Sequence, residues 1–252
     1  MLALAGCAGF NKNPRDPWEP MNRGVAEFNE AADSIVLKPV ATAYRQAIPP
    51  IVRTGVSNFF GNLSDGWSFA NSLLQFKFQN AAENFMRLNV NTVFGLGGIF
   101  DVASELNIER HREDFGQTLG RWGFPAGPYM VLPLLGPSTL RDTLALTVDW
   151  QADPIHYLNS ATARSALYAL RGVDVRANLL RLGNVIDEAA LDRYSFTRDA
   201  YLQKRRAEIT ENKESESDGA EPKADGTPSP AAAPAAAPAA GAASEPAPPP
   251  KQ

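Results

Sequence analysis

One cysteine stands in a short apolar N-terminus, where its chemistry would be acceptance of a lipid. Leu4-Ala5-Gly6-Cys7 places an aliphatic residue three positions before the thiol and two small residues between them. Small residues at these positions suit the cleft of a signal peptidase. The pattern predicts a diacylglyceryl group on Cys7, whose acyl chains anchor a protein at about 0.8 kcal/mol per buried CH₂. The alternative is a free thiol.

The residues before Cys7 form a shorter signal than secretion requires. Residues 1–6 contain no Lys or Arg, whereas a secretory signal has a basic region and about 7–15 apolar residues. We therefore expect residues 1–6 to be part of a signal sequence whose start lies upstream. Ala8, rather than Asp, follows the cysteine, which favours sorting to the outer membrane of a bacterial envelope.

The other reactive side chains form no catalytic or metal-binding motif. The strings Gly55–Phe59 and Gly136–Leu140 each contain Gly-x-Ser but lack the second glycine of a hydrolase elbow, and we expect Ser138 to be a helix N-cap. His111 and His156 lie far apart in the chain, outside any His-Glu-x-x-His motif, and are expected on the surface or in loops. These patterns predict no enzyme activity, no metal and no cofactor.

A glycine-rich string, Gly95-Leu96-Gly97-Gly98, resembles a phosphate-binding loop only loosely, because it lacks Gly-Lys-Ser/Thr. We interpret it as a sharp turn where glycine lets apolar segments approach closely. The apolar segment 93–102 around it has two possible environments: a protein core or lipid acyl chains.

Charge and composition divide the chain. The chain has 24 Lys+Arg and 28 Asp+Glu. Residues 211–252 hold seven acids and three bases, which leaves 21 of each sign in the rest. A formally neutral body argues against a nucleic-acid partner, since that affinity depends on cations that neutralise phosphates. Residues 211–252 contain no Val, Ile, Leu, Met or aromatic residue, so we expect a disordered Ala/Pro-rich tail.

The elements that must position these residues are predicted to be helices. Hydrophobic spacing indicates helices over 24–47, with a break at Pro39, over 65–93 as two helices, and over 138–148, 164–186 and 191–210. Residues 7–23 are expected to be an extended lead-in, and 116–136 an ordered aromatic loop. No clear alternating strand pattern occurs, so the class is all-α or mainly α. An apolar stripe at helical spacing comprises Phe78, Ala81, Ala82, Phe85, Leu88 and Val93.

Many short strings occur in a fixed order along the chain: Asp16-Pro17-Trp18-Glu19-Pro20-Met21-Asn22-Arg23, Phe28-Asn29, Lys38-Pro39-Val40-Ala41, Asn58-Phe59, Gly61-Asn62-Leu63, Arg87 with Asn91 through Ala103, Asp114 through Gly120, Gly127-Pro128-Tyr129, Leu132-Pro133, Gly136-Pro137-Ser138, Arg141-Asp142 and Arg198-Asp199-Ala200-Tyr201. With these strings the chain resembles the MlaA (VacJ) family of Gram-negative outer-membrane lipoproteins. The resemblance covers about residues 16–206.

The resemblance implies a single ring-shaped helical domain, residues 24–210, in the inner leaflet of the outer membrane. It implies phospholipid transport: lipid that has strayed into the outer leaflet passes through an amphipathic channel to a periplasmic, MlaC-like carrier, which maintains lipid asymmetry. A trimeric porin is the implied membrane partner. The alternative is a scaffold lipoprotein that tethers porins or envelope layers without moving lipid.

The resemblance also suggests candidate site residues. Phe28 and Asn29 match the family's motif near a channel gate, and Leu96, Ile99 and Phe100 are candidates for a wall that faces acyl chains. Three charged residues have two possible roles, either on the head-group path or in a structural ion pair: Asp101, Arg141 and Asp142.

Overall fold

The chain is mainly helical, which confirms the predicted fold class. A computed structural model describes residues 13–189 and 191–218, with the side chains of residues 13–180 and 191–210. The helices are α1 (Glu19–Ala32), η1 (Asp33–Leu37, a π-helix), α2 (Lys38–Ala47), α3 (Pro50–Leu74), α4 (Phe78–Val93), α5 (Val102–Glu105), α6 (Phe115–Arg121), α7 (Leu140–Ala152), η2 (Pro154–Tyr157, a 3₁₀ turn), α8 (Ala161–Ala189) and α9 (Arg193–Asp218), and the strands are β1 (Tyr129–Leu132) and β2 (Gly136–Thr139).

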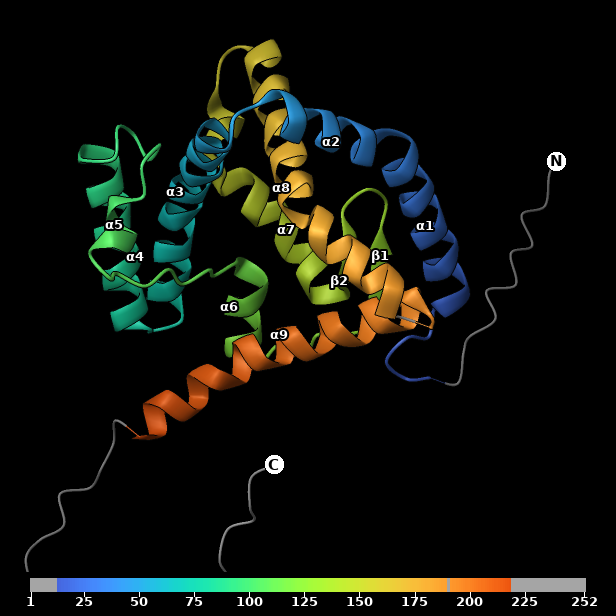
Figure 1. Ribbon diagram of the computed structural model, residues 1–252. Helices are drawn as coiled ribbons and strands as arrows, with labels where there is room; N and C mark the ends of the chain where they lie inside the picture. The colour runs from blue at the N-terminus through green and yellow to red at the C-terminus, as the bar shows by residue number, and fades with distance from the viewer. Residues whose placement is uncertain (1–12, 190, 219–252) are drawn as a thin grey trace, which may run out of the picture.

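Figure 1 shows two limbs that meet at the long helix α8. In that view α1 and α2 arch over the right side and the top, and α9 runs across the bottom. The β1–β2 hairpin lies between α1 and α8, while α3, α4, α5 and α6 form the left limb. The chain therefore places residues from its beginning, middle and end around the hairpin.

The predicted break near Pro39 is a change of helix type. Helix α1 passes through the π-helix η1 into α2, whose second residue is Pro39. Proline cannot donate the backbone hydrogen bond of a helix interior, and sharp helix bends occur mostly at prolines and at π turns. The chain bends here without leaving the helical state.

The structure corrects several predicted boundaries. Helix α1 begins at Glu19, so the lead-in is not extended through Arg23. Helix α9 continues past Glu211 to Asp218, into the predicted disordered tail. Cys7 and residues 219–252 lie outside the described residues.

Residues 116–136, predicted as a loop, contain a helix and a strand. Helix α6 is capped by Asp114, whose carboxylate accepts from the Gln117 amide at 2.8 Å. Strand β1 then pairs antiparallel with β2, with Tyr129 opposite Thr139. Ser138 belongs to β2, and Thr139 is the N-cap of α7 instead. The strands are four residues each, too short for an alternating pattern to reveal them.

Candidate functional site

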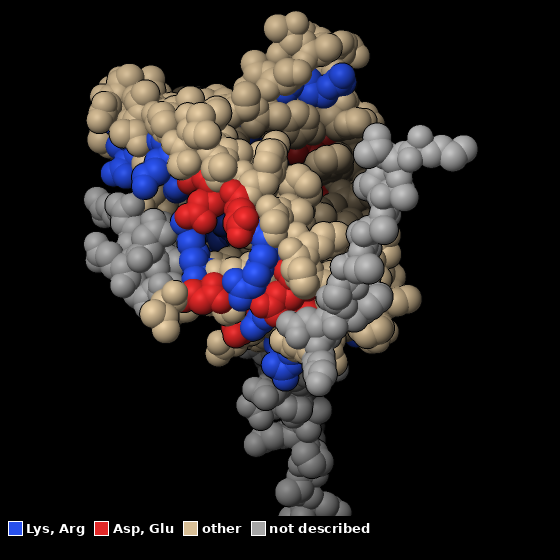
Figure 2. Space-filling model, turned by 90° about the vertical axis from the view of Figure 1, so that its right-hand side faces the viewer, with Lys and Arg blue, Asp and Glu red and all other residues tan. Residues whose placement is uncertain are grey.

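A cavity of about 540 Å³ lies between α1, the hairpin, α8 and the start of α9. Figure 2 views this side of the molecule and shows acidic and basic side chains gathered around a hollow. The charged lining residues are Arg23, Glu27, Glu30, Asp33, Arg176, Asp192 and Arg193. The apolar lining residues are Ala26, Leu37, Val131, Leu134, Leu135, Pro137 and Leu179. The cavity is therefore amphipathic.

Ion pairs tie the walls of the cavity together. Asp33 of η1 binds Arg176 of α8 at 2.5 and 2.7 Å. Glu30 of α1 binds Arg193 at 2.9 Å. The Arg176 guanidinium outweighs partial burial and holds the pKa of Asp33 below its usual value. These ion pairs join α1 and η1 to α8 and α9, so charged side chains held by one another form the rim of the cavity.

A third pair closes the same rim beside an aromatic ring. Arg23 of α1 binds Asp192 at 2.7 Å. Its guanidinium also lies 4.4 Å from the centre of the Tyr194 ring. Hydrogen bonds from Arg23 and Ser195 keep the pKa of Asp192 well below its usual range, so this carboxylate stays charged.

Two asparagines of α1 hold the edge of the hairpin. Asn22 donates to the Tyr129 carbonyl at 3.0 Å and accepts from the Val131 amide at 2.9 Å. Asn29 makes the same two kinds of hydrogen bond nearer the tip of the hairpin. It donates to Leu132 O at 2.9 Å and accepts from Leu134 N at 2.7 Å. The seven residues from Asn22 to Asn29 rise about 10.5 Å along the helix, and the three residues from Tyr129 to Leu132 span about 10 Å along the strand. The two asparagines are therefore spaced to match the two carbonyls. Asn29 therefore fixes the hairpin tip that carries Leu134 and Leu135 into the cavity.

The left limb buries polar groups and exposes apolar ones. Helix α4 buries Ala81, Asn84, Arg87 and Asn91. Three large members of its predicted apolar stripe are exposed, Phe78 and Val93 at 67% each and Phe85 at 48%, whereas Leu88 is half-buried. Ordinary globular proteins rarely expose contiguous apolar patches of this kind, which mark interaction with a membrane or another protein.

Helix α3 also buries polar side chains. It buries Asn62, Asp65, Ser68, Asn71 and Ser72 along one side. Buried Asp65 accepts from Arg110 Nη2 at 3.1 Å, and burial raises the pKa of this carboxyl against the pull of Arg110 and Arg87. No described helix combines the length and the apolar character needed to cross a membrane.

The structure separates the predicted gate residues from the predicted acyl-facing wall. Asn29 lines the cavity, whereas its neighbour Phe28 is 55% exposed and is absent from the lining. Leu96, Ile99 and Phe100 lie in the turn after α4 on the other limb, each at least 44% exposed. A Cβ on Gly98 would meet Asn62 at 2.5 Å, which confirms that glycine allows the close approach predicted for this turn.

The three charged candidates belong to two separate ion-pair groups. Asp101 caps α5 and binds Arg87 at 2.7 Å. Burial alone would raise the pKa of Asp101, but hydrogen bonds from Ser104 and Asn91 and the charge of Arg87 hold it at about 2. Neither Asp101 nor Arg87 lines the described cavity.

Arg141 and Asp142 are neighbours that bind each other at 2.8 Å on α7. Asp142 also accepts from Tyr201 at 2.9 Å and from Arg205 at 3.0 Å, which ties α7 to α9. Burial favours the neutral acid, yet Arg205 and Arg141 lower the pKa of Asp142 below its usual value. Arg205 lies within α9 and binds three carboxylates, those of Asp142, Asp114 and Glu208.

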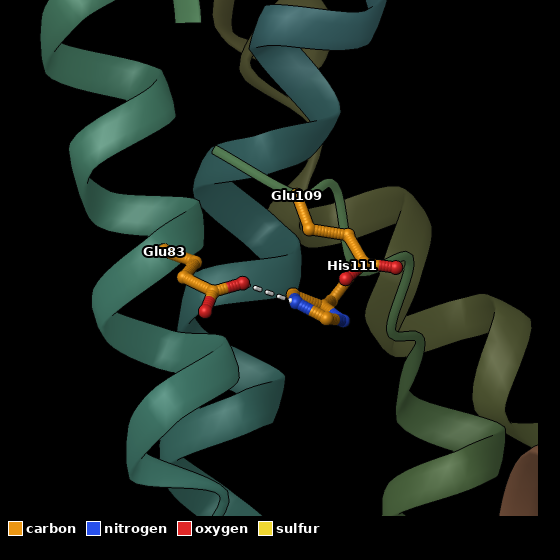
Figure 3. A group of neighbouring side chains, drawn as sticks. All are labelled: Glu83, Glu109 and His111. Atoms are coloured by element: carbon orange, nitrogen blue, oxygen red, sulfur yellow. Dashed lines mark hydrogen bonds and ion pairs between the residues drawn. The ribbon is translucent and has the colours of Figure 1, made fainter. Parts of the chain in front are cut away.

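A small cluster of possible metal ligands escaped the sequence reasoning. Glu83, Glu109 and His111 place one ligand atom each within 4.8 Å of one another. Figure 3 shows Glu83 on α4 facing the loop that carries the other two, with His111 Nε2 2.6 Å from Glu83 Oε2. Spacing along the chain could not reveal the group, since Glu83 comes from a different element. No fourth described His, Cys, Asp or Glu joins it.

Comparison with known proteins gives a consistent result. The family model described as MlaA lipoprotein matches residues 14–208. A relative from Escherichia coli K12, "Intermembrane phospholipid transport system lipoprotein MlaA", is 35% identical over 80% of this chain and 82% of its own. The chain belongs to the MlaA lipoprotein family. The match begins before α1 and extends into α9, so it includes every wall of the cavity.

Other relatives and a solved structure agree with the family assignment. The protein of the same name from Haemophilus influenzae is 33% identical over 84% of this chain and 88% of its own. An uncharacterized protein from Rickettsia bellii is 31% identical over 77% of this chain and 76% of its own. A solved structure from work on the structural basis for maintenance of bacterial outer membrane lipid asymmetry has a TM-score of 0.68 and 33% identity, covering 77% of this chain and 98% of that one.

Proposed function

We propose that this member of the MlaA family removes mislocalised phospholipid from the outer leaflet of the outer membrane and passes it to a periplasmic carrier. The cavity between α1, the hairpin, α8 and α9 would be part of the passage. The observation that carries the proposal is the cavity's mixed lining, with a charged rim and an apolar wall. A phospholipid needs both, since its head group is polar and its tails are apolar. The names of the relatives support transport between membranes.

The exposed apolar side chains of the left limb support a position within one leaflet of the membrane. The left limb presents apolar side chains outward and buries polar side chains inward, as a protein surrounded by lipid requires. We propose that the segment with Leu96, Ile99 and Phe100 faces acyl chains, and that Phe28 and Asn29 act at the gate. Acyl chains on Cys7 would anchor the protein at the periplasmic face of the outer membrane.

We propose a trimeric porin as membrane partner and an MlaC-like protein as the carrier. The proposed activity is transfer, so it requires no catalytic step and no cofactor. If lipid moves downhill, or the carrier draws it away, the chain itself needs no site for energy coupling.

The first test measures phospholipid on the surface of intact cells that lack this protein, by a surface-accessible labelling assay. Surface phospholipid should rise, and the wild type should restore it while Cys7→Ala should not. An unchanged surface, together with a porin defect, would favour the scaffold alternative.

A second experiment separates transport from scaffolding within the folded protein. Thr197 lines the cavity on α9, while Ala200 lies exposed on the same helix and outside the lining. Thr197→Trp should narrow the passage and raise surface phospholipid, and Ala200→Trp should not. Equal rescue by both variants would contradict transport through this cavity.

A further inference from the structure

A second concavity, of about 380 Å³, has three cations and no acid among its six lining residues. Its lining residues are Lys38, Thr42, Arg45 and Gln46 of α2, Arg53 of α3 and Leu180 of α8. Residues 38, 42 and 45 are spaced by four and three, so they share one face of α2. The turn at Ile48 and Pro49 then returns the chain so that Arg53 joins them. Two helices thus supply three positive charges to one hollow.

These cations differ from most arginines of this protein because no described carboxylate neutralises them. Nine other arginines bind a carboxylate: Arg23, Arg87, Arg110, Arg141, Arg171, Arg176, Arg193, Arg198 and Arg205. Within the described part of the chain, Lys38, Arg45 and Arg53 form no ion pair, and Arg53 donates only to the Ile48 carbonyl at 3.1 Å.

Two described acids close to α2 already have other partners. Asp33, in η1 just before α2, binds Arg176, and the charge of Lys38 contributes only a smaller lowering of the pKa of Asp33. Asp174 of α8 accepts from Ser57 at 2.7 Å and from Tyr44 at 3.3 Å. Gathered like charges are unfavourable unless a counter-charge joins them. The hollow therefore favours an anion from outside the described chain.

The helices that carry these cations also expose apolar side chains. Val40 of α2 is 45% exposed, and Ile51 and Val52 of α3 are 74% and 50% exposed. A free ion would use the cations alone, whereas a phosphate that carries acyl chains would also cover the apolar neighbours. Lys and Arg beside apolar surface are typical of sites for anionic lipid head groups.

The cationic hollow adjoins the amphipathic cavity. Leu37 lines the cavity and the next residue, Lys38, lines the hollow. Likewise, Leu179 lines the cavity and Leu180 lines the hollow. The contact of Ala41 with Ala177 and Leu180 lies at this boundary. A head group held in the hollow would therefore lie just outside one wall of the cavity.

We propose that Lys38, Arg45 and Arg53 bind the phosphate of a phospholipid head group beside the cavity. The anion chemistry follows from three cations that form no ion pair with any described carboxylate, and the lipid as its source rests on the proposed function. The site would hold a lipid at the entrance or exit of the passage.

The test uses the full chain in detergent and vesicles of phosphatidylcholine, with or without phosphatidylglycerol. The variant Lys38→Gln/Arg45→Gln, here the hollow variant, removes two cations whose side chains make no described hydrogen bond. The control Arg112→Gln/Arg206→Gln removes two exposed cations elsewhere, so both proteins have the same net charge. Each basic residue near an anionic surface contributes about 1 kcal/mol, so we expect affinity for phosphatidylglycerol vesicles to fall about 30-fold in the first variant alone.

Two results would overturn the proposal. An equal loss in both double variants would mean that general charge attraction, rather than this hollow, binds the vesicles. Calorimetric binding of inorganic phosphate that only the hollow variant abolishes, with unchanged vesicle binding, would assign the site to free phosphate. Thermal unfolding of each variant checks that the fold is intact, and Arg53→Lys, which keeps the charge, should retain vesicle binding.

The vesicle experiment and the cell experiment fail separately. If cells show no rise in surface phospholipid but the hollow variant still loses vesicle binding, the transport function is wrong and the head-group site stands. If Thr197→Trp blocks lipid removal while the hollow variant binds vesicles normally, the passage stands and the site is wrong.

Discussion

The replacement Asn29→Asp tests whether the asparagine on α1 holds the hairpin tip. The wild-type amide donates to Leu132 O and accepts from Leu134 N. Aspartate keeps the shape and the acceptor but loses the donor, so at neutral pH a carboxylate oxygen faces a carbonyl oxygen. Loss of one hydrogen bond costs about 1 kcal/mol, and the unpaired carbonyl adds about 1 kcal/mol more. We therefore expect the free energy of unfolding to fall by about 2 kcal/mol at pH 7.

The variant should recover its stability in acid. A protonated aspartate can donate to the Leu132 carbonyl, so the fold favours the neutral form. A loss of about 2 kcal/mol corresponds to a pKa raised by about 1.5, from roughly 3.9 to roughly 5.4. Because the folded pKa is raised, the stability is fully present below about pH 3.9 and is lost as pH rises through about 5.4.

Thermal unfolding between pH 4 and pH 7 measures this difference. For a body of about 200 residues, 2 kcal/mol lowers Tm by about 4–8 °C at pH 7, and the gap should close near pH 4. Asn89→Asp is a matched control, since Asn89 is exposed on α4 and donates only to Phe85 O within its own helix. A gap that does not change with pH, or an equal gap in the control, would refute the role of Asn29 in holding the hairpin.

Three further changes test the packing that supports the cavity. Gly98, at φ +93°, lies against α3, so Gly98→Ala should lower the free energy of unfolding, measured in urea, by about 3 kcal/mol. Gly97, at φ +72°, lies in open space, so Gly97→Ala should lower it by only about 1 kcal/mol. Equal losses would contradict the close approach. Arg205→Met should cost about 3 kcal/mol in the same assay because it removes a partner of buried Asp142, and a neutral result would mean that Arg141 suffices. Asp101→Asn should flatten the loss of stability between pH 5 and pH 2, since the low pKa of Asp101 contributes about 2 kcal/mol above pH 4 that disappears as pH falls through about 2. An unchanged slope would contradict this.

The sequence alone was sufficient for the helical class and for the family. Helical spacing placed α8 and located the break near Pro39, because periodicity and proline act over a few neighbouring residues. The ordered strings between residues 16 and 206 indicated the family, and a family model matching 14–208 bears this out. The hairpin escaped because strands of four residues leave too few positions to show alternation.

Only the tertiary structure decided which way the faces point and which distant residues meet. A periodic stripe identifies a face of α4, yet it cannot tell whether Phe78 and Val93 meet a core, lipid or water. Arg205 meets Asp114 and Asp142 from far along the chain, and Asn29 meets the hairpin tip in the same way. Such contacts depend on how the chain returns on itself, whereas helical periodicity depends on residues three and four apart. The cavity is built from the first kind of contact, so local sequence could not reveal it. The cations of the hollow lie within residues 38–53, but only the tertiary structure brings Leu180 of α8 against them.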